Sequence, residues 1–199
     1  MRRVLFISHP DVVVSRDVPV PQWPLSVVGR ARMHAALVQP WIPEISAVYC
    51  STEQKAIDAA EILSRHLSLS FTAVHQLGEN DRSATGFLPP EEFELVADQF
   101  FAKPFESVRG WEAASAAQQR IVDAVNSLVE MDSSSGTIAI VSHGAVGTLL
   151  YCHLSGQPIS RRWDQCPNGG GNYYSFQLNP KCVFSWWKTI DEIAHQSVA

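Results

Sequence analysis

The sequence predicts an α/β fold in which a mostly parallel sheet is flanked by helices. Apolar runs alternate with helical patterns along the chain, which is the arrangement that builds parallel strands. The runs at 4–8 and 137–143 have the composition of buried strands. A chain of 199 residues with 46% hydrophobic residues is long enough for one well-filled core and short for two, so we expect a single domain.

Each element has its own local signal. The predicted strands cover 4–8, 45–51, 69–77 and 137–143, and the predicted helices cover 27–38, 52–67, 111–131 and 145–156. Ser26 is a suitable N-cap for the first helix and Gly156 a suitable stop for the last. The runs 173–178 and 183–190, joined by Asn179-Pro180, predict an antiparallel hairpin at the sheet edge. Segment 78–110 combines prolines with an aromatic-rich helix.

Composition excludes several classes of function. A formal charge of −5 argues against a nucleic-acid binder, which needs a basic surface. No apolar run is long enough to cross a bilayer, and the apolar run after Met1-Arg2-Arg3 is too short for a signal peptide. The four cysteines are far apart and favour neither a zinc site nor a disulfide framework. We therefore expect a cytoplasmic protein with reduced thiols and no metal.

Polar side chains gather where the predicted strands end. His9 and His143 each follow a buried strand, and Lys55 comes one helical turn after the strand that ends at Ser51. Glu79 follows the third strand, with Asp81 as a second candidate acid. Because parallel strands present their carboxyl ends at one edge of a sheet, these groups are expected to converge. Two imidazoles, an ammonium and a carboxyl group suit phosphoryl transfer.

Five short segments carry a resemblance to a known family. They are Ser8-His9-Pro10, Leu25-Ser26-Val27-Val28-Gly29, Ser51 with Lys55-Ala56, Leu77-Gly78-Glu79, and Ser142-His143-Gly144. In order and spacing they resemble the motifs of the histidine phosphatases, the phosphoglycerate-mutase-like superfamily, in which the first motif is Arg-His-Gly. The resemblance covers nearly the whole chain.

The resemblance implies both a fold and an activity. The fold would be a three-layer α/β/α sandwich formed by residues 1–199, with a substrate-facing cap at about 80–110. His9 would be the nucleophile that becomes phosphorylated, His143 would bind a phosphoryl oxygen, and Glu79 would protonate the leaving alkoxide. The reaction would be hydrolysis of a small phosphate monoester, with no organic cofactor and no metal.

The sequence departs from the family's pattern in the predicted phosphate pocket. Ser8 stands where the family has arginine, and Lys55 replaces a second, bidentate arginine with a point charge. Each lost hydrogen bond to a charged group costs roughly 1.5–3 kcal/mol. Arg16, Arg82 and Arg109 could compensate, and Arg82 is favoured because it leaves the same strand end as Glu79. With Gly144 of the last motif, Ser8, Lys55, Arg82 and Arg16 form the predicted substrate-binding set.

Alternative interpretations remain open. The altered pocket also fits a degenerate, catalytically weak family member that binds a phosphorylated ligand or partner. A weaker alternative is an interaction module that uses the aromatic side chains of the cap. The glycine run within 167–172 indicates a turn rather than a phosphate cradle, since no helix begins after it. Assembly into a homodimer is a further expectation.

Overall fold

The computed structural model describes residues 2–192, and within them a seven-stranded sheet has the order β3-β2-β4-β1-β5-β6, with β7 paired to β5. The strands are β1 (Val4–Ser8), β2 (Ile45–Ser51), β3 (Phe71–Val74), β4 (Thr137–Ser142), β5 (Asn172–Leu178), β6 (Lys181–Val183) and β7 (Lys188–Thr189). The pairs among β1, β2, β3 and β4 are parallel, whereas β5 is antiparallel to its neighbours. The mostly parallel α/β fold is confirmed.

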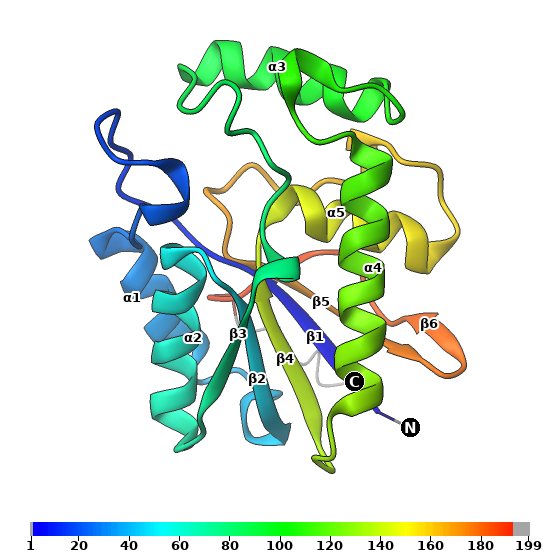
Figure 1. Cartoon of the computed structure of the whole chain (residues 1–199). Helices are drawn as coiled ribbons and strands as arrows, with labels where there is room; N and C mark the ends of the chain where they lie inside the picture. Colours follow the sequence, from blue (N-terminus) through cyan, green and yellow to red (C-terminus); the bar gives the residue numbers. More distant parts are fainter. Residues whose placement is uncertain (1, 193–199) are drawn as a thin grey trace, which may run out of the picture.

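Five helices surround this sheet in the described part of the chain. They are α1 (Val27–Ala36), α2 (Gln54–Leu67), α3 (Pro90–Ala102), α4 (Ala114–Met131) and α5 (Gly144–Ser155). Figure 1 shows α1 and α2 on one face of the sheet and α4 and α5 on the other. The three-layer arrangement follows from strands that are apolar on both faces and therefore need a helical layer on each. Between residues 2 and 192, none of the helices combines the length and the apolar character that crossing a bilayer requires.

Strand β1 shows how both layers form one core. Its side chains alternate between the faces, as strand geometry requires. Val4 and Phe6 join the hydrophobic cluster of α4 and α5, whereas Leu5 and Ile7 join the cluster of α1 and α2. All four side chains are at most 1% exposed. Burying an apolar side chain of this size stabilises the fold by about 1.5–3 kcal/mol, so this central strand is held from both sides.

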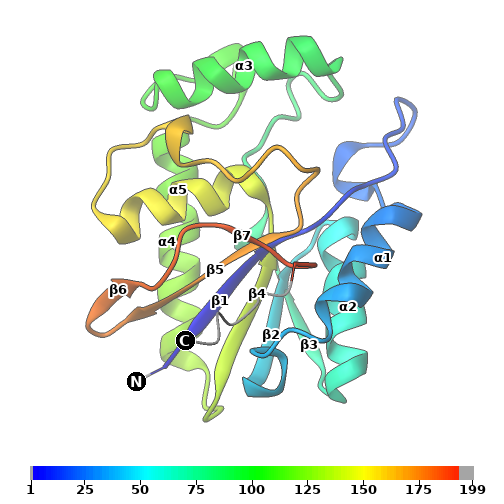
Figure 2. The ribbon, with the colours of Figure 1, turned by 180° about the vertical axis from the view of Figure 1, so that it is seen from behind.

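The segment between β3 and α4 lies over the carboxyl ends of the parallel strands. It begins with a single 3₁₀ turn at His75–Leu77 and carries α3, which Figure 1 and Figure 2 show apart from the sheet and above α5. Phe100 and Trp111 are buried and pack against each other with ring centroids 6.1 Å apart. This cap segment closes one side of the space above the strand ends.

Several predicted boundaries are wrong, among them the following. The third strand ends at Val74 because the chain turns into the 3₁₀ segment before Glu79. The predicted strand 183–190 is two short strands, β6 and β7, that pair with different parts of β5. Helix α2 begins at Gln54 instead of residue 52, because Glu53 has extended backbone angles.

Candidate active site

The register of β1 and β4 brings His9 and His143 together. The two strands are parallel and pair Ser8 with Ser142, so the residue after each strand lies beside the other. The His9 N–H continues the ladder by donating to the Ser142 carbonyl over 3.0 Å. As a result the two imidazole rings lie 5.1 Å apart between centroids, at an interplanar angle of 73°. His9 is partly buried, whereas His143 is fully buried.

His9 has the protonation state of a nucleophile. Its Nδ1 atom lies 2.9 Å from the carbonyl oxygen of Pro10, so the Nδ1–H tautomer donates this hydrogen bond and Nε2 keeps its lone pair. Burial and the charges of Lys55 and Arg82 lower the pKa of His9 to about 4, against the opposing effects of Pro10 and Glu53. The ring is therefore neutral at physiological pH.

The glycine run holds the backbone of His9. The Gly171 N–H donates to the His9 carbonyl over 3.0 Å. Gly170 has a φ of +76°, and a Cβ atom on it would lie only 2.3 Å from that carbonyl oxygen, so no other residue fits here without a shift. This segment is a turn, as the sequence indicated, and it holds the backbone of the candidate nucleophile through the carbonyl of His9.

Glu79 faces the start of α5. Its Oε1 atom accepts the Val146 N–H over 3.1 Å and the Asn80 N–H over 3.2 Å, and Oε2 accepts the Ala145 N–H over 3.3 Å. Burial nevertheless raises the pKa of Glu79, and only part of this is offset by the positive charge of Arg82. Glu79 can therefore hold a proton at a pH at which an exposed carboxyl group has lost it.

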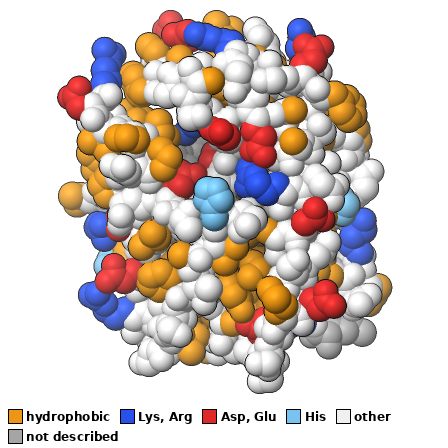
Figure 3. Space-filling model, in the orientation of Figure 1, with side chains coloured by type: hydrophobic (Ala, Val, Ile, Leu, Met, Phe, Trp, Pro, Cys, Tyr) orange, Lys and Arg blue, Asp and Glu red, His pale blue; other side chains and the backbone are white. Residues whose placement is uncertain are grey.

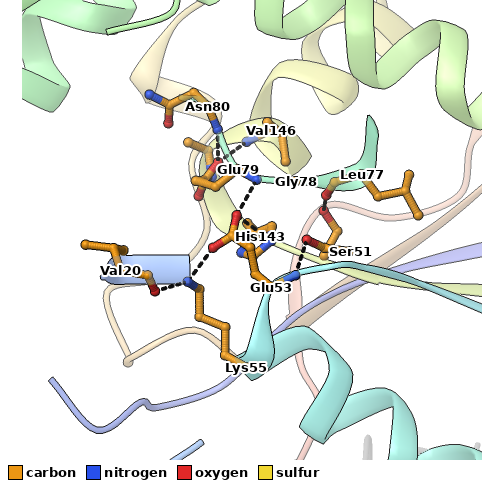
Figure 4. Close-up of polar contacts among 12 residues, drawn as sticks. Val20, Ser51, Glu53, Lys55, Leu77, Gly78, Glu79, Asn80, His143 and Val146 are labelled. Atoms are coloured by element: carbon orange, nitrogen blue, oxygen red, sulfur yellow. Dashed lines mark hydrogen bonds and ion pairs between the residues drawn. The ribbon is translucent and has the colours of Figure 1, made fainter. Parts of the chain in front are cut away.

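Lys55 is buried, and its ammonium group is hydrogen-bonded to two protein oxygens. Its Nζ donates to the Val20 carbonyl over 2.9 Å and to Glu53 Oε2 over 2.5 Å (Figure 4). The other oxygen of Glu53 accepts the Glu79 N–H over 2.9 Å and lies 3.3 Å from His143 Nε2. The latter contact is outside hydrogen-bond geometry, and His143 has no other polar partner among the described residues. Glu53 thus contacts two of the groups that were predicted to bind phosphate, Lys55 and His143.

A cavity of about 600 Å³ lies below the cap, and Glu53, Glu79 and Arg82 line it, whereas His9 and His143 do not. Its wall is formed by residues 19–21, 52–53 and 78–83, together with His75, Gly86, Glu112 and Arg120. Figure 3 shows acidic side chains gathered around this hollow. Glu53 and Val20 lie in the wall and cover Lys55, which does not itself line the cavity. No group of three or more metal-ligating side chains is assembled anywhere in residues 2–192.

Only one of the three candidate arginines reaches the cavity. Arg82 lines it, with its guanidinium carbon 4.9 Å from the centre of the Phe93 ring. Arg16 is exposed and lies 5.2 Å above Phe87, and Arg109 pairs with Glu92 on the surface. The structure therefore brings Arg82, but neither Arg16 nor Arg109, to the predicted site.

Ser8 bonds to protein groups, so its predicted contact with a substrate remains a prediction. It is fully buried, and its hydroxyl donates to Gln165 Oε1 over 2.6 Å and accepts the Asn172 N–H over 3.0 Å. The Gln165 carboxamide extends from Ser8 toward Gly144, where a Cβ atom would lie 2.3 Å from Nε2. Gly144 stands at the start of α5, next to His143, so its predicted contact with a phosphoryl group remains a prediction.

Sequence reasoning missed Glu53, Gln165 and Arg120. Arg120 pairs with Glu112 and donates to the carbonyls of Gln76, Gly78 and Glu79, so it fixes the loop that carries the candidate acid. Glu53 lies inside the segment from Ser51 to Lys55 that carried the resemblance, so its charge was a sequence signal that could have identified it as a site residue. No sequence signal pointed to Gln165 or Arg120, because their partners are far away in sequence.

Known proteins resemble this chain in sequence and in fold. The sequence profile of the histidine phosphatase superfamily (branch 1) matches residues 17–182, a segment that begins after the Ser8-His9-Pro10 motif. No sequence among curated proteins matches the chain.

Solved structures show the same fold. A mycobacterial glucosyl-3-phosphoglycerate phosphatase with inorganic phosphate superposes with a TM-score of 0.78 at 17% identity, over 96% of this chain and 100% of that one. YhfR of Bacillus stearothermophilus gives 0.77 at 21% identity, over 98% and 99%. Phosphoserine phosphatase of Entamoeba histolytica, in complex with 3-phosphoglyceric acid, gives 0.73 at 16% identity, over 95% and 98%.

Proposed function

Because this chain belongs to the histidine phosphatase superfamily, we propose that it hydrolyses a small phosphate monoester through a phosphohistidine on His9. The first step is attack on phosphorus by the lone pair of His9 Nε2. The bond from phosphorus to the ester oxygen breaks, and Glu79 gives its proton to that oxygen, so that the alcohol leaves as a neutral molecule.

The second step returns the enzyme to its starting state. The Glu79 carboxylate takes a proton from a water molecule, whose oxygen attacks the phosphorus of phosphohistidine. The phosphorus–nitrogen bond breaks, which releases inorganic phosphate and neutral His9. His143, Lys55 and Arg82 donate hydrogen bonds or positive charge to the phosphoryl oxygens in both steps.

The observation that carries this proposal is that the pKa of His9 is lowered whereas that of Glu79 is raised. The mechanism needs a neutral histidine and a protonated carboxyl group in the same molecule. With ordinary values of about 6.5 and 4.3 these two states rarely coexist. Here the pKa of His9 falls to about 4 through burial and its cationic neighbours, and burial raises that of Glu79. Pairs of titratable groups shifted in this way are typical of acid–base catalysis.

A second candidate is binding of a phosphorylated ligand or partner without turnover. Two observations favour it: the Ser8 hydroxyl is committed to Gln165 and Asn172, and Lys55 is paired with Glu53. The raised pKa of Glu79 argues against it, because a protein that only binds phosphate has no use for a leaving-group acid.

Reactions with a panel of phosphate esters separate the two candidates. The phosphatase releases phosphate, and peptide mass spectrometry of protein quenched in alkali, in which phosphohistidine is stable, finds a phosphoryl group on His9. The His9→Ala variant lacks both signals. A wild-type protein that binds phosphate esters but releases no phosphate from any of them would establish the binding function instead.

A cytoplasmic location is also part of the proposal. It is supported by the state of the cysteines, because Cys50, Cys152, Cys166 and Cys182 are all free.

A further inference from the structure

We propose that the Glu53 carboxylate is an internal competitor of the phosphoryl group, which must displace it from Lys55 and His143 before a phosphate ester can be held beside His9. This inference rests on the proposed function. It assigns to Glu53 the role of setting how tightly the site binds phosphate.

Glu53 is placed for this role by its backbone. It is the N-cap residue of α2, with φ −77° and ψ 140°, yet its side chain does not cap its own helix. The carboxylate turns into the site instead, where Oε2 accepts from Lys55 Nζ. Oε1 accepts the Glu79 N–H over 2.9 Å and lies 3.3 Å from His143 Nε2. Figure 4 shows the carboxylate between these three groups.

These partners are the ones that an anionic phosphoryl group would use. Lys55 has one remaining oxygen partner, the Val20 carbonyl, and neither ring nitrogen of His143 has a hydrogen-bond partner among the described residues. Together with Val20, Glu53 also forms the part of the cavity wall that covers Lys55, which is only 3% exposed. A phosphate ester that enters this cavity meets the carboxylate before it meets the ammonium.

The charge of Glu53 makes the competition strong. Burial alone would raise the pKa of Glu53, but His143, Lys55 and the hydrogen bonds from Lys55 and Glu79 together lower it to about 2. The group is therefore an anion at every pH at which the protein would work. It neutralises Lys55 and repels a phosphoryl group placed against the same donors, in a buried setting where such repulsion is poorly screened.

A purely structural ion pair makes the opposite prediction. If Glu53 only positioned Lys55, removing its charge would loosen the ammonium and weaken phosphate binding. If it competes, removing its charge strengthens binding, because Lys55 keeps the Val20 carbonyl and gains a free donor.

The test measures the affinity of inorganic phosphate for Glu53→Gln and for a matched control, Glu112→Gln, by calorimetry at low ionic strength. Glutamine keeps the shape of the side chain and the acceptor for the Glu79 N–H. Glu112 lines the same cavity and is likewise paired with a cation, Arg120. We expect Glu53→Gln to bind phosphate at least about tenfold more tightly than wild type, given the strength of a close charge pair. Glu112→Gln should stay near the wild-type value.

The outcomes separate this inference from the proposed function. Unchanged or weaker phosphate binding by folded Glu53→Gln overturns the inference, even if wild type hydrolyses esters through His9. Tighter binding supports it, even if no ester is hydrolysed, in which case the phosphatase proposal fails alone. An equal gain in Glu112→Gln would also overturn it, since the effect would then belong to the charge of the whole cavity. Glu53→Ala repeats the test if the glutamine side chain itself bonds Lys55.

Discussion

The imidazole rings of His9 and His143 lie 5.1 Å apart, although the two residues are separated by most of the chain. Their closeness follows from one parallel strand pair, in which Ser8 is opposite Ser142. Each ring then has a different environment. His9 is anchored through Nδ1 to Pro10, whereas His143 is fully buried and faces Glu53. This asymmetry supports the proposal that His9 attacks phosphorus and that His143 binds a phosphoryl oxygen.

Removing the imidazole of His9 should abolish turnover and leave the fold intact. His9→Ala is expected to lower kcat by at least about 10³-fold, as loss of a nucleophile does in other hydrolases. The measurement is steady-state hydrolysis of an aryl phosphate, with circular dichroism to check folding. His66→Ala, an exposed position on α2, is the control and should retain wild-type kcat. Full activity of His9→Ala would show that another group attacks phosphorus.

Arg82 should take the place of the missing arginine. Arg82→Ala is expected to raise the inhibition constant of inorganic phosphate by about 10- to 150-fold, the equivalent of one hydrogen bond to a charged group. Arg109→Ala is the matched control, because Arg109 pairs with Glu92 outside the cavity. If both variants keep the wild-type constant, Arg82 only packs on Phe93. Arg82→Lys, which keeps the charge, should lie between wild type and Arg82→Ala.

Close packing of α5 on β1 predicts a stability effect. A Cβ atom on Gly147 would lie 2.5 Å from Phe6 Cε1 and 2.7 Å from Trp187 Cη2, two buried rings. Overpacking in Gly147→Ala should therefore lower the free energy of unfolding by about 1–3 kcal/mol. The higher helix propensity of alanine should offset up to about 1 kcal/mol of this loss. Urea unfolding measures the change. Val27→Ala, at a position that is 86% exposed, is the control. A Gly147→Ala protein as stable as wild type would mean that the rings move aside at no cost.

The sheet and the two histidines were predictable because the signals are local. The run at 4–8 is apolar at every position up to the serine. This pattern is typical of a strand that is buried on both faces. The polar residue that follows such a strand must then lie at the sheet edge. The second such run ends before His143, and two parallel strands suffice to place both rings together.

The remainder depends on contacts that cross the sequence. Ser8 was expected at the substrate because it stands where the family has arginine, but alternation along a strand turns adjacent side chains to different sides. Its hydroxyl instead meets Gln165, 157 residues later. Arg82 was favoured over Arg16 because it follows the same strand end as Glu79. The path of the cap places Arg82 in the cavity wall, whereas Arg16 is exposed.

Glu79 should matter most for esters with poor leaving groups. Glu79→Gln is expected to slow hydrolysis of an alkyl phosphate by about 10²–10⁴-fold, the usual contribution of a general acid, and that of an aryl phosphate far less. Asp81→Asn is the control. Asp81 is exposed, and its pKa is lowered by hydrogen bonds from Ser83, so it lacks a proton to donate. Equal losses on both substrates in Glu79→Gln, with a larger loss on the alkyl ester in Asp81→Asn, would transfer the role to Asp81.

The pH profile of kcat/KM on an alkyl phosphate should be bell-shaped, with its maximum on the acidic side of neutrality. As pH rises through about 4, His9 loses its proton and becomes a nucleophile, so the acid limb belongs to His9. As pH rises further, through the raised pKa of Glu79, the acid is lost and the rate falls. The second ionisation of the substrate, near pH ~6, affects wild type and Glu79→Gln alike. The ratio of their rates therefore isolates Glu79: it should be constant at low pH and decline above the pKa of that carboxyl group. An acid limb near the ordinary histidine value of about 6.5 would show that neither burial nor Lys55 and Arg82 depress the pKa of His9, and the ordering of the two groups on which the mechanism depends would be wrong.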